Sequence, residues 1–550
     1  MTRPRTGRLS APALACALLL AACSPGPVGA PATDDDGAAA RRIQADVHFL
    51  ADDLLEGRQA GTRGYDIAAL YVQARFQAIG LEPAGDDGGF LQAVPLVQGL
   101  RIPDGARLAL ERDGQTREFA FQADFLPGIG FDADRSAVSA PMVFVGQAVH
   151  APEAGHDDFD GVDLQGRIAV YFGGAPARFD NDHRAFHSSG REKLAALAAR
   201  GAVGAVMLSD PEREARAPWA RSARNWLTPG MRLLGADGSP VDTFPQLQVT
   251  ASLGPEASAA LLAGAPLPLE EIHARLEAGT LVAFELPGTL HLAQRSALER
   301  LVSHNVVGRI PGSDPALADE HVVYTAHLDH VGIGAPVDGD RIYNGAYDNA
   351  VGTAIMVEAA GMALAAGPTR RSQVFVAVTA EEKGLLGAMH FARNPGLPGR
   401  LVANLNMDMP LLFGPQHDVV PYGIEHSTLR EPAQRAAAAL GVKLSPDPFP
   451  EEVIFVRSDQ YAFVREGIPA LYLDAGIESA EPGVDAMAQA QDFFRNHYHQ
   501  PSDTVALPIH YPTAVRLARL NQRIGAEVGG ADEPPRWNPG NFFGERFARD

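Results

Sequence analysis

The C-terminal half of the chain alternates short apolar runs with longer segments of helical apolar spacing. The apolar runs that we expect to be strands are 321–326, 373–380, 401–407 and 470–474. The segments that we expect to be helices are 350–366, 385–393, 429–440 and 513–528. Strands that alternate with helices predict a largely parallel sheet with helices on both faces. The sequence therefore predicts an α/β fold with a mixed, largely parallel central sheet flanked by helices.

The length and composition of the chain limit its class. With 550 residues, it is long enough for two or three domains. An apolar content of 46% and a charged content of 21% are typical of a soluble globular protein. The formal net charge of −21 argues against nucleic acid as a partner, because phosphates repel such a surface. The two cysteines are Cys16 and Cys23, so a site further along the chain has no thiolate to use.

Changes in composition and pattern divide the chain. Residues 23–40 are rich in Pro, Ala, Gly and Asp and predict a flexible tether. A first part of the main domain is expected at 41–130, and the regular α/β pattern occupies 289–528. Between them, 131–288 has short apolar runs that read as strands and no catalytic pattern. The Pro- and Gly-containing tail, 529–550, is expected to be an arm or poorly ordered.

The N-terminus has the pattern of an export signal. A basic stretch precedes an apolar run at 11–22, which is too short to span a bilayer as a permanent helix. The run ends in a Leu-Ala-Ala-Cys sequence at Cys23, which resembles a bacterial lipobox, and Ser24 in place of Asp favours the outer membrane. We therefore expect a signal peptide at 1–22 and an exported lipoprotein, periplasmic or on the cell surface, held to the membrane only by its N-terminal lipid. The alternative is ordinary cleavage nearby with loss of Cys23.

Side chains that can bind metal follow three of the predicted strands where each strand ends. These residues are His327, the pair Glu381 and Glu382, and Asp408. Because the carboxyl ends of parallel strands meet at one edge of a sheet, we expect these groups to lie close together. Two loop residues, Asp348 and His499, add a carboxylate that can bridge two cations and an imidazole that can cap one of them.

This ligand set indicates the chemistry of the site. Imidazole and carboxylate ligands without sulfur suit zinc, cobalt or manganese, and we expect zinc. Two ions that share a carboxylate stand about 3.5–4 Å apart and hold a water whose pKa falls to about 7. One member of the Glu381–Glu382 pair then stays free to accept a proton, because adjacent strand-end residues point in opposite directions. His-Glu-x-x-His, Gly-x-Ser-x-Gly and phosphate-loop motifs are absent from the sequence.

Five segments together resemble the co-catalytic di-zinc aminopeptidase family, which contains secreted bacterial leucyl aminopeptidases and glutamate carboxypeptidase. They are 325–329, 347–350, 379–382, 406–409 and 498–504. The resemblance extends over roughly 41–130 and 290–528. The middle region, 131–288, resembles the protease-associated domain inserted into such peptidases, through 163–168 and 200–205. The resemblance implies the zinc exopeptidase fold with an inserted, mainly β, protease-associated domain.

The resemblance also implies two metal sites that share one residue. Asp348 corresponds to the bridging ligand. His327 and Asp408 would complete one site, and Glu382 and His499 would complete the other. A cis peptide bond is implied directly after the bridging aspartate.

The remaining roles concern catalysis and substrate. Glu381 corresponds to the general base, and Asp329 to a carboxylate that orients the first histidine ligand. Tyr498 is similar to a tyrosine that stabilises the oxyanion. Arg457 falls where some relatives contact the far end of the substrate, and the free α-amine would be held near Asp408.

These roles predict an aminopeptidase with two Zn²⁺ ions, with Co²⁺ or Mn²⁺ as alternatives, that hydrolyses N-terminal residues from peptide substrates by a metal-bridged water. A glutamate carboxypeptidase and a glutaminyl cyclase with one metal remain alternatives. A scaffold that has lost its metals is the non-enzymatic alternative, and the intact ligand set argues against it. We expect five other histidines to be bystanders: His330, His390, His417, His426 and His497.

Overall fold

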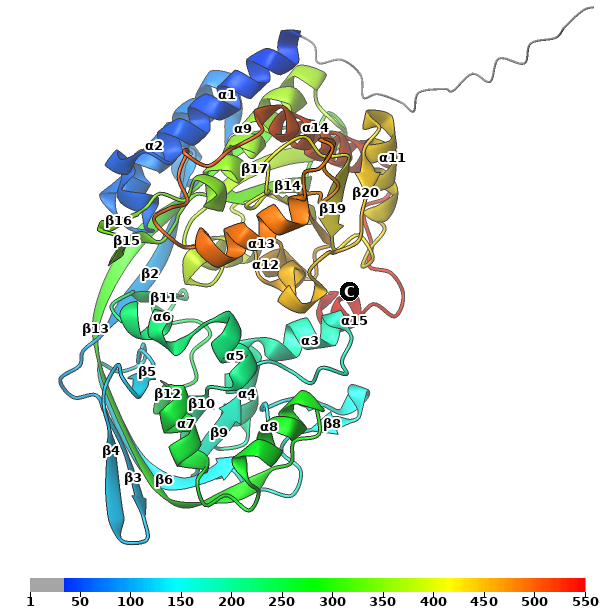
Figure 1. The fold of residues 1–550 in the computed structure, drawn as a ribbon. Helices are drawn as coiled ribbons and strands as arrows, with labels where there is room; N and C mark the ends of the chain where they lie inside the picture. The colour runs from blue at the N-terminus through cyan, green and yellow to red at the C-terminus, as the bar shows by residue number, and fades with distance from the viewer. Residues whose placement is uncertain (1–33, 550) are drawn as a thin grey trace, which may run out of the picture.

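The structure, a computed structural model, describes residues 34–549 and has two lobes (Figure 1). The predicted signal peptide, the lipobox cysteine Cys23 and the first part of the predicted tether lie outside the described residues. The larger lobe contains both ends of the described chain, and the smaller lobe is formed by its middle. One long strand, β13 (Phe284–Ile310), runs through both lobes and pairs with strands in each.

The central sheet of the larger lobe is parallel in its middle. Around β14 (Glu320–His327), the parallel neighbours are β17 (Ser372–Val378), β18 (Arg400–Asn406) and, beyond β18, β21 (Ala470–Ala475). Antiparallel strands extend the sheet on both sides, namely β13 with β2 (Leu91–Arg101), and β19 (Asp418–Tyr422). The predicted mixed, largely parallel sheet is confirmed, and its strands lie where the apolar runs predict them.

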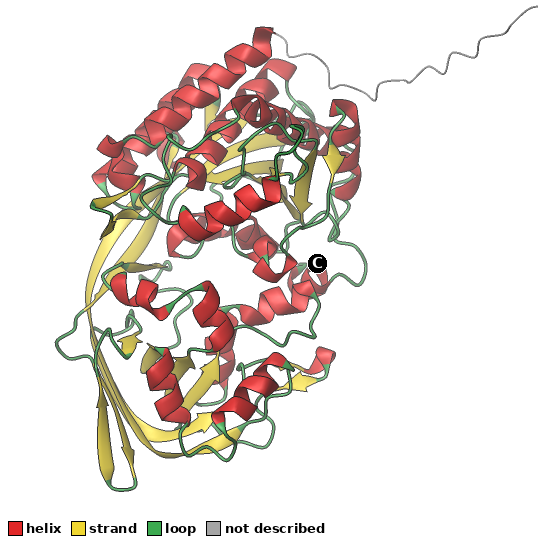
Figure 2. Ribbon diagram, viewed as in Figure 1, coloured by secondary structure: helices red, strands yellow, loops and turns green. Residues whose placement is uncertain are grey.

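Helices cover both faces of this sheet (Figure 2). One face is covered by α1 (Asp34–Leu50), α2 (Arg63–Ile79), α9 (Gly352–Ala366), α11 (Arg430–Leu440) and α14 (Tyr511–Gly530). The other face is covered by α10 (Leu386–Arg393) and α12 (Gln460–Val464). In β14, Val322 and Tyr324 pack with the first group and Val323 packs with the second. Burial on both faces explains why the central strands are continuous apolar runs.

The smaller lobe has a sheet and an apolar core of its own. In spatial order its strands are β4 (Gln115–Phe119), β3 (Arg107–Arg112), β13, β6 (Arg135–Phe144), β9 (Ile168–Phe172), β10 (Gly204–Leu208), β12 (Val249–Leu253) and β5 (Phe125–Pro127). Its helices are α3 (Asn181–Ser188), α4 (Gly190–Ala199), α5 (Pro211–Arg216), α6 (Trp219–Arg224), α7 (Pro255–Leu262) and α8 (Leu269–Glu277). The predicted start of the inserted domain at residue 131 stays a prediction. The apolar core of the smaller lobe also contains Leu108 and Phe119, which precede that residue.

Both ends of the described chain are more ordered than the sequence indicates. The predicted tether runs to residue 40, whereas α1 begins at Asp34, where Asp36 pairs with Arg519 of α14 and Ala39 is buried. The predicted loose tail forms α15 (Phe542–Phe547). Phe543 is fully buried in the larger lobe, whereas Phe542 makes an edge-to-face contact with Phe186 of the smaller lobe. The tail therefore contacts both lobes. Burial of its aromatic side chains between them removes a large apolar surface from water and stabilises this arrangement.

Candidate metal centre

The predicted ligands meet at the carboxyl edge of β14, β17 and β18. His327 is the last residue of β14, Glu381 and Glu382 lie in the turn after β17, and Asp408 follows β18. The two loop residues also reach this edge. Asp348 lies in the segment before α9, with the expected cis peptide bond to the next residue. His499 lies in the loop after α13 (Ala486–Asn496).

The two oxygens of Asp348 face two different groups of side chains. Oδ1 lies 3.2 Å from Nε2 of His327, and that nitrogen lies 2.9 Å from Oδ1 of Asp408. Oδ2 lies 3.0 Å from Nε2 of His499, and that nitrogen lies 3.2 Å from Oε2 of Glu382. A buried carboxylate between two such groups has the geometry of a bridging ligand. The structure thus brings together all five predicted metal ligands.

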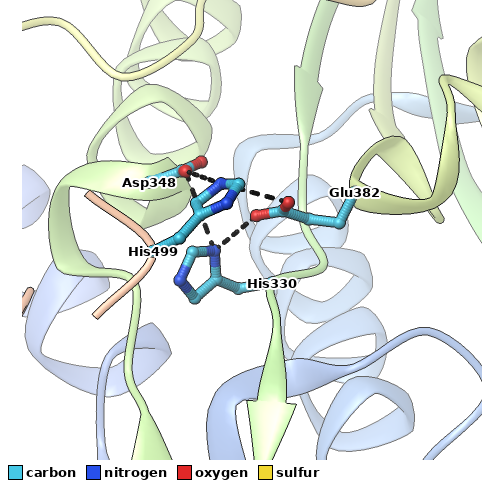
Figure 3. A group of neighbouring side chains, drawn as sticks. All are labelled: His330, Asp348, Glu382 and His499. Carbon is cyan, nitrogen blue, oxygen red and sulfur yellow. Dashed lines mark ion pairs between the residues drawn. The ribbon is translucent and has the colours of Figure 1, made fainter. Parts of the chain in front are cut away.

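His330, which is expected from the sequence to be a bystander, is a sixth member of this cluster (Figure 3). Its ring is fully buried, and its Nδ1 lies 2.7 Å from Oε1 of Glu382 and 3.9 Å from Oδ2 of Asp348. Its ring centroid lies 5.5 Å from that of His499. The signal in the sequence is its position three residues after His327, just past the end of the strand.

The residues at this edge fit divalent cations of the zinc type. Two groups of donors, one of three residues and one of four, offer imidazole nitrogens and carboxylate oxygens without sulfur. Oε1 of Glu382 and both ring nitrogens of His330 are buried without a hydrogen-bond partner. Buried polar atoms are nearly always partnered, so the facing pair of Nδ1 of His330 and Oε1 of Glu382 indicates a ligand between them. Several buried carboxylates so close together also need a compensating cation.

The two adjacent glutamates have different environments. Burial raises the pKa of Glu381 well above its ordinary value, and neighbouring carboxylates act in the same direction. Burial also acts to raise the pKa of Glu382, but His499 and His330 outweigh it and keep that pKa well below the ordinary value. Glu381 belongs to neither donor group. One glutamate is therefore a charged member of a donor group, and the other is a more basic group beside it.

Asp329 acts on this site differently from the prediction. Nδ1 of His327 lies 3.1 Å from the main-chain carbonyl of Asp329, not from its carboxylate. The carboxylate is fully buried and accepts hydrogen bonds from the backbone N–H groups of Glu381, at 3.0 Å, and Glu382, at 3.4 Å. The predicted contact of the carboxylate with the histidine is wrong, because the side chain points under the turn after β17. Asp329 therefore fixes the glutamate pair.

Tyr498 and Arg457 line a cavity that opens onto the cluster, together with Met409, Ile454 and Phe494. The ring of Tyr498 stacks on His499, with 3.9 Å between centroids. Burial raises the pKa of its hydroxyl well above the ordinary value, so the group remains an O–H donor.

At the rim of this cavity, Nη1 of Arg457 lies 3.0 Å from Oε2 of Glu452. The Arg457 side chain is 46% exposed, so part of the guanidinium stays available to a bound molecule.

Arg58 supports the cluster from behind, and local sequence reasoning does not find it. Its guanidinium is fully buried and donates to the main-chain carbonyls of Leu328, Asn344 and Gly345 at 3.0, 2.6 and 3.1 Å, and also to that of Leu50. Burial lowers the pKa of Arg58 to about 10, so the group is charged at neutral pH. It ties the end of β14 to the loop that leads to the bridging carboxylate.

Two further polar residues hold individual ligands. Asp503 accepts hydrogen bonds from the backbone N–H groups of Tyr347, at 2.9 Å, and Asp348, at 3.0 Å. Ser458 donates to Oδ2 of Asp408 at 2.5 Å, so the other oxygen of this carboxylate stays directed at the first histidine ligand. Asp503 lies inside a segment that carries the family resemblance, which is a signal for its role.

The chain is similar to known peptidases in sequence and in fold. Residues 305–524 match peptidase family M28. An aminopeptidase from Aneurinibacillus sp. strain AM-1 superimposes with a TM-score of 0.52 at 18% identity, over 90% of this chain and 95% of that one. A zinc aminopeptidase from Bacillus subtilis gives a TM-score of 0.43 at 19% identity, over 90% and 96%. A peptidase M28 precursor from Shewanella amazonensis gives 0.44 at 18% identity, over 92% and 98%. No curated protein matches the sequence.

The fold and the donor cluster define a metal-dependent hydrolase with an α/β fold. The first of these structures shares the fold, and the sequence match spans β14 to α14, where every candidate ligand lies. The segment that carries the site, residues 305–524, resembles peptidase family M28 in sequence.

Proposed function

We propose that the protein is a zinc-dependent aminopeptidase with two metal ions, which removes N-terminal residues from peptides. The observation that carries the proposal is Asp348, whose two oxygens face two separate groups of ligands. A shared carboxylate between such groups is the arrangement of two-metal hydrolytic sites. Zinc fits the donors best, and cobalt or manganese would suit the same donors.

The residues of the chain divide the chemistry between them. When bound, two zinc ions polarise the scissile carbonyl and supply a hydrolytic water at neutral pH. Glu381 accepts the proton of that water and returns it to the leaving amine, for which its raised pKa is suited. Tyr498 donates a hydrogen bond to the oxyanion that forms in the transition state, because its O–H stays protonated.

The charges around the cavity favour a free α-amine at the cleaved end of the substrate. Asp408 and Glu381 line the cavity, and their carboxylates attract a protonated amine. Among the described residues that line the cavity, Arg457 carries the positive side chain, and this side chain already pairs with Glu452. A glutamate carboxypeptidase needs a basic pocket for a carboxylate, which one shared arginine supplies poorly. Arg457 instead suits a contact with the far end of a short peptide.

We also infer that the smaller lobe is a protease-associated insert that shapes the substrate cleft. Nη2 of Arg221 in α6 donates to the main-chain carbonyl of Tyr498 at 3.0 Å. Nη2 of Arg184 in α3 donates to the carbonyl of Pro450 at 2.9 Å. A second cleft, lined in part by this lobe, shares Glu452 with the catalytic cavity. The lobe thus contacts both loops that border the metal site.

The experiment that tests the function is a substrate panel with and without a chelator. Aminoacyl chromogenic substrates, their N-blocked forms and peptides with an N-terminal glutamine are assayed side by side, and bound zinc is counted. Cleavage of free-amine substrates only, abolished by the chelator and restored by zinc, supports the proposal. Release of C-terminal residues favours a carboxypeptidase. Cyclisation of glutamine with about one ion per chain favours a glutaminyl cyclase.

We propose that the protein is an exported lipoprotein, on the strength of the basic and apolar N-terminal pattern before Cys23 and of Ser24 after it. Fractionation of expressing bacteria after feeding with labelled palmitate tests this. Label in the outer-membrane fraction that disappears in Cys23→Ala supports lipid attachment. Unlabelled protein in the soluble periplasm favours ordinary signal cleavage.

A further inference from the structure

His330 occupies a place that the proposed ligand set does not use. Its ring is completely buried and lies beside the ring of His499, and the two rings face different oxygens of Glu382 (Figure 3). Neither ring nitrogen has a hydrogen-bond partner, and the facing oxygen of Glu382 has none either. Nδ1 lies within ion-pair distance of that oxygen, at 2.7 Å, but the contact lacks the geometry of a hydrogen bond.

The spacing of the donor atoms suits one small cation. Nδ1 of His330 lies 2.7 Å from Oε1 of Glu382 and 3.9 Å from Oδ2 of Asp348. Nε2 of His499 lies 3.2 Å from the other oxygen of Glu382 and 3.0 Å from the same oxygen of Asp348. Ligands at about 2.0–2.2 Å from a tetrahedral zinc ion stand roughly 3.3–3.6 Å apart. The observed separations lie on both sides of this range.

We propose that His330 is a fourth protein ligand of the ion held by Asp348, Glu382 and His499. The inference rests on the proposed two-metal function and makes its two sites unequal. One site then has four protein donors, as in closed structural zinc sites. The other, formed by His327, Asp348 and Asp408, has three donors and keeps a free position, as catalytic zinc sites do. Substrate binding and water activation then fall mainly to the three-ligand site.

A cysteine in place of His330 tests direct ligation. The purified His330→Cys protein is stripped of metal and reloaded with Co²⁺, and its near-ultraviolet spectrum is recorded. A thiolate bound to Co²⁺ gives a sulfur-to-cobalt charge-transfer band. The wild-type protein has no cysteine in this part of the chain, so it should not show the band. His321→Cys is the matched control, because His321 is a buried histidine at the opposite end of β14. We expect the band in His330→Cys only.

His330→Ala measures what the ligand contributes to affinity. We expect the affinity for one of the two zinc ions to fall by more than about 100-fold. Loss of a residue that only hydrogen-bonds to a metal ligand typically lowers metal affinity by about 10–100-fold, and loss of a ligand itself should cost more. Co²⁺ loaded into this variant should also change its visible absorption, because the coordination number or geometry changes.

Thermal unfolding of the metal-free variants shows that they fold. An absent charge-transfer band together with an unchanged zinc affinity in His330→Ala would overturn the proposal, while a wild-type protein that binds no zinc would overturn the proposed function instead.

Discussion

Replacement of the buried Arg58 by methionine tests how the two metal-bearing loops are held in place. Methionine has a similar length, so the change removes the charge and the hydrogen bonds with little loss of volume. Four main-chain carbonyls then lose their guanidinium donor, among them those of Leu328 and Asn344. A buried acceptor left unpaired costs about 1–3 kcal/mol.

Relaxation of the loops and other contacts of these carbonyls offset part of that cost. We therefore expect the free energy of unfolding of metal-free Arg58→Met to fall by about 3–5 kcal/mol, less than four fully unpaired acceptors at about 1–3 kcal/mol each would cost. The zinc affinity should fall as well, because Arg58 holds in place the loops that carry His330 and Asp348. Arg58→Lys keeps the charge but not the planar fork, so its loss should be smaller.

Urea unfolding of the metal-free proteins, followed by circular dichroism, gives the stability, and competition with a zinc chelator gives the affinity. Added zinc should restore part of the stability of Arg58→Met, because a ligand that binds the folded state stabilises it. A change below about 1 kcal/mol with an unaltered zinc affinity would refute the view that Arg58 clamps the site.

Three other predictions concern catalysis and pH. Glu381→Gln should keep its full zinc content and lose about 10²–10⁴-fold in kcat, since only the general base is removed, and near-normal turnover would exclude that role. Tyr498→Phe should lower kcat by up to about 10²–10³-fold with little change in KM, and a change in KM alone would indicate a binding role. Burial raises the pKa of Asp474 to about 8, well above its unfolded value, so the stability due to its neutral form is present at low pH and lost as pH rises through 8. Asp474→Asn, whose oxygen can keep both backbone hydrogen bonds, should therefore be more stable than the wild type at pH 9 by a few kcal/mol and no more stable near pH 4, as measured by urea unfolding. Equal stability at pH 9 would contradict the raised pKa.

The sequence predicts the positions of the ligands well because their signal is local. A histidine or carboxylate directly after an apolar run must lie at the carboxyl edge of the sheet, which holds for His327, Glu382 and Asp408. Asp348 and His499 have no such local constraint, and the family resemblance identifies them.

The remaining features depend on long-range packing, which a local pattern does not encode. The chain leaves the sheet after His327, and its path there directs His330 into the cluster and the Asp329 carboxylate under the neighbouring turn. Arg58 reaches carbonyls that are about 270 to 290 residues away in the sequence. The ordered tail likewise depends on aromatic partners in both lobes, among them Phe186.

Zinc content per chain tests the shared carboxylate most directly. The wild-type protein, His327→Ala, His499→Ala and Asp348→Ala are each loaded with zinc, dialysed against metal-free buffer and analysed by mass spectrometry of the metal, with circular dichroism to show that each is folded. A bridging Asp348 predicts two ions in the wild type, about one after either histidine replacement, and none or nearly none in Asp348→Ala. Two ions retained by a folded Asp348→Ala, or none bound by the wild type, would contradict the account.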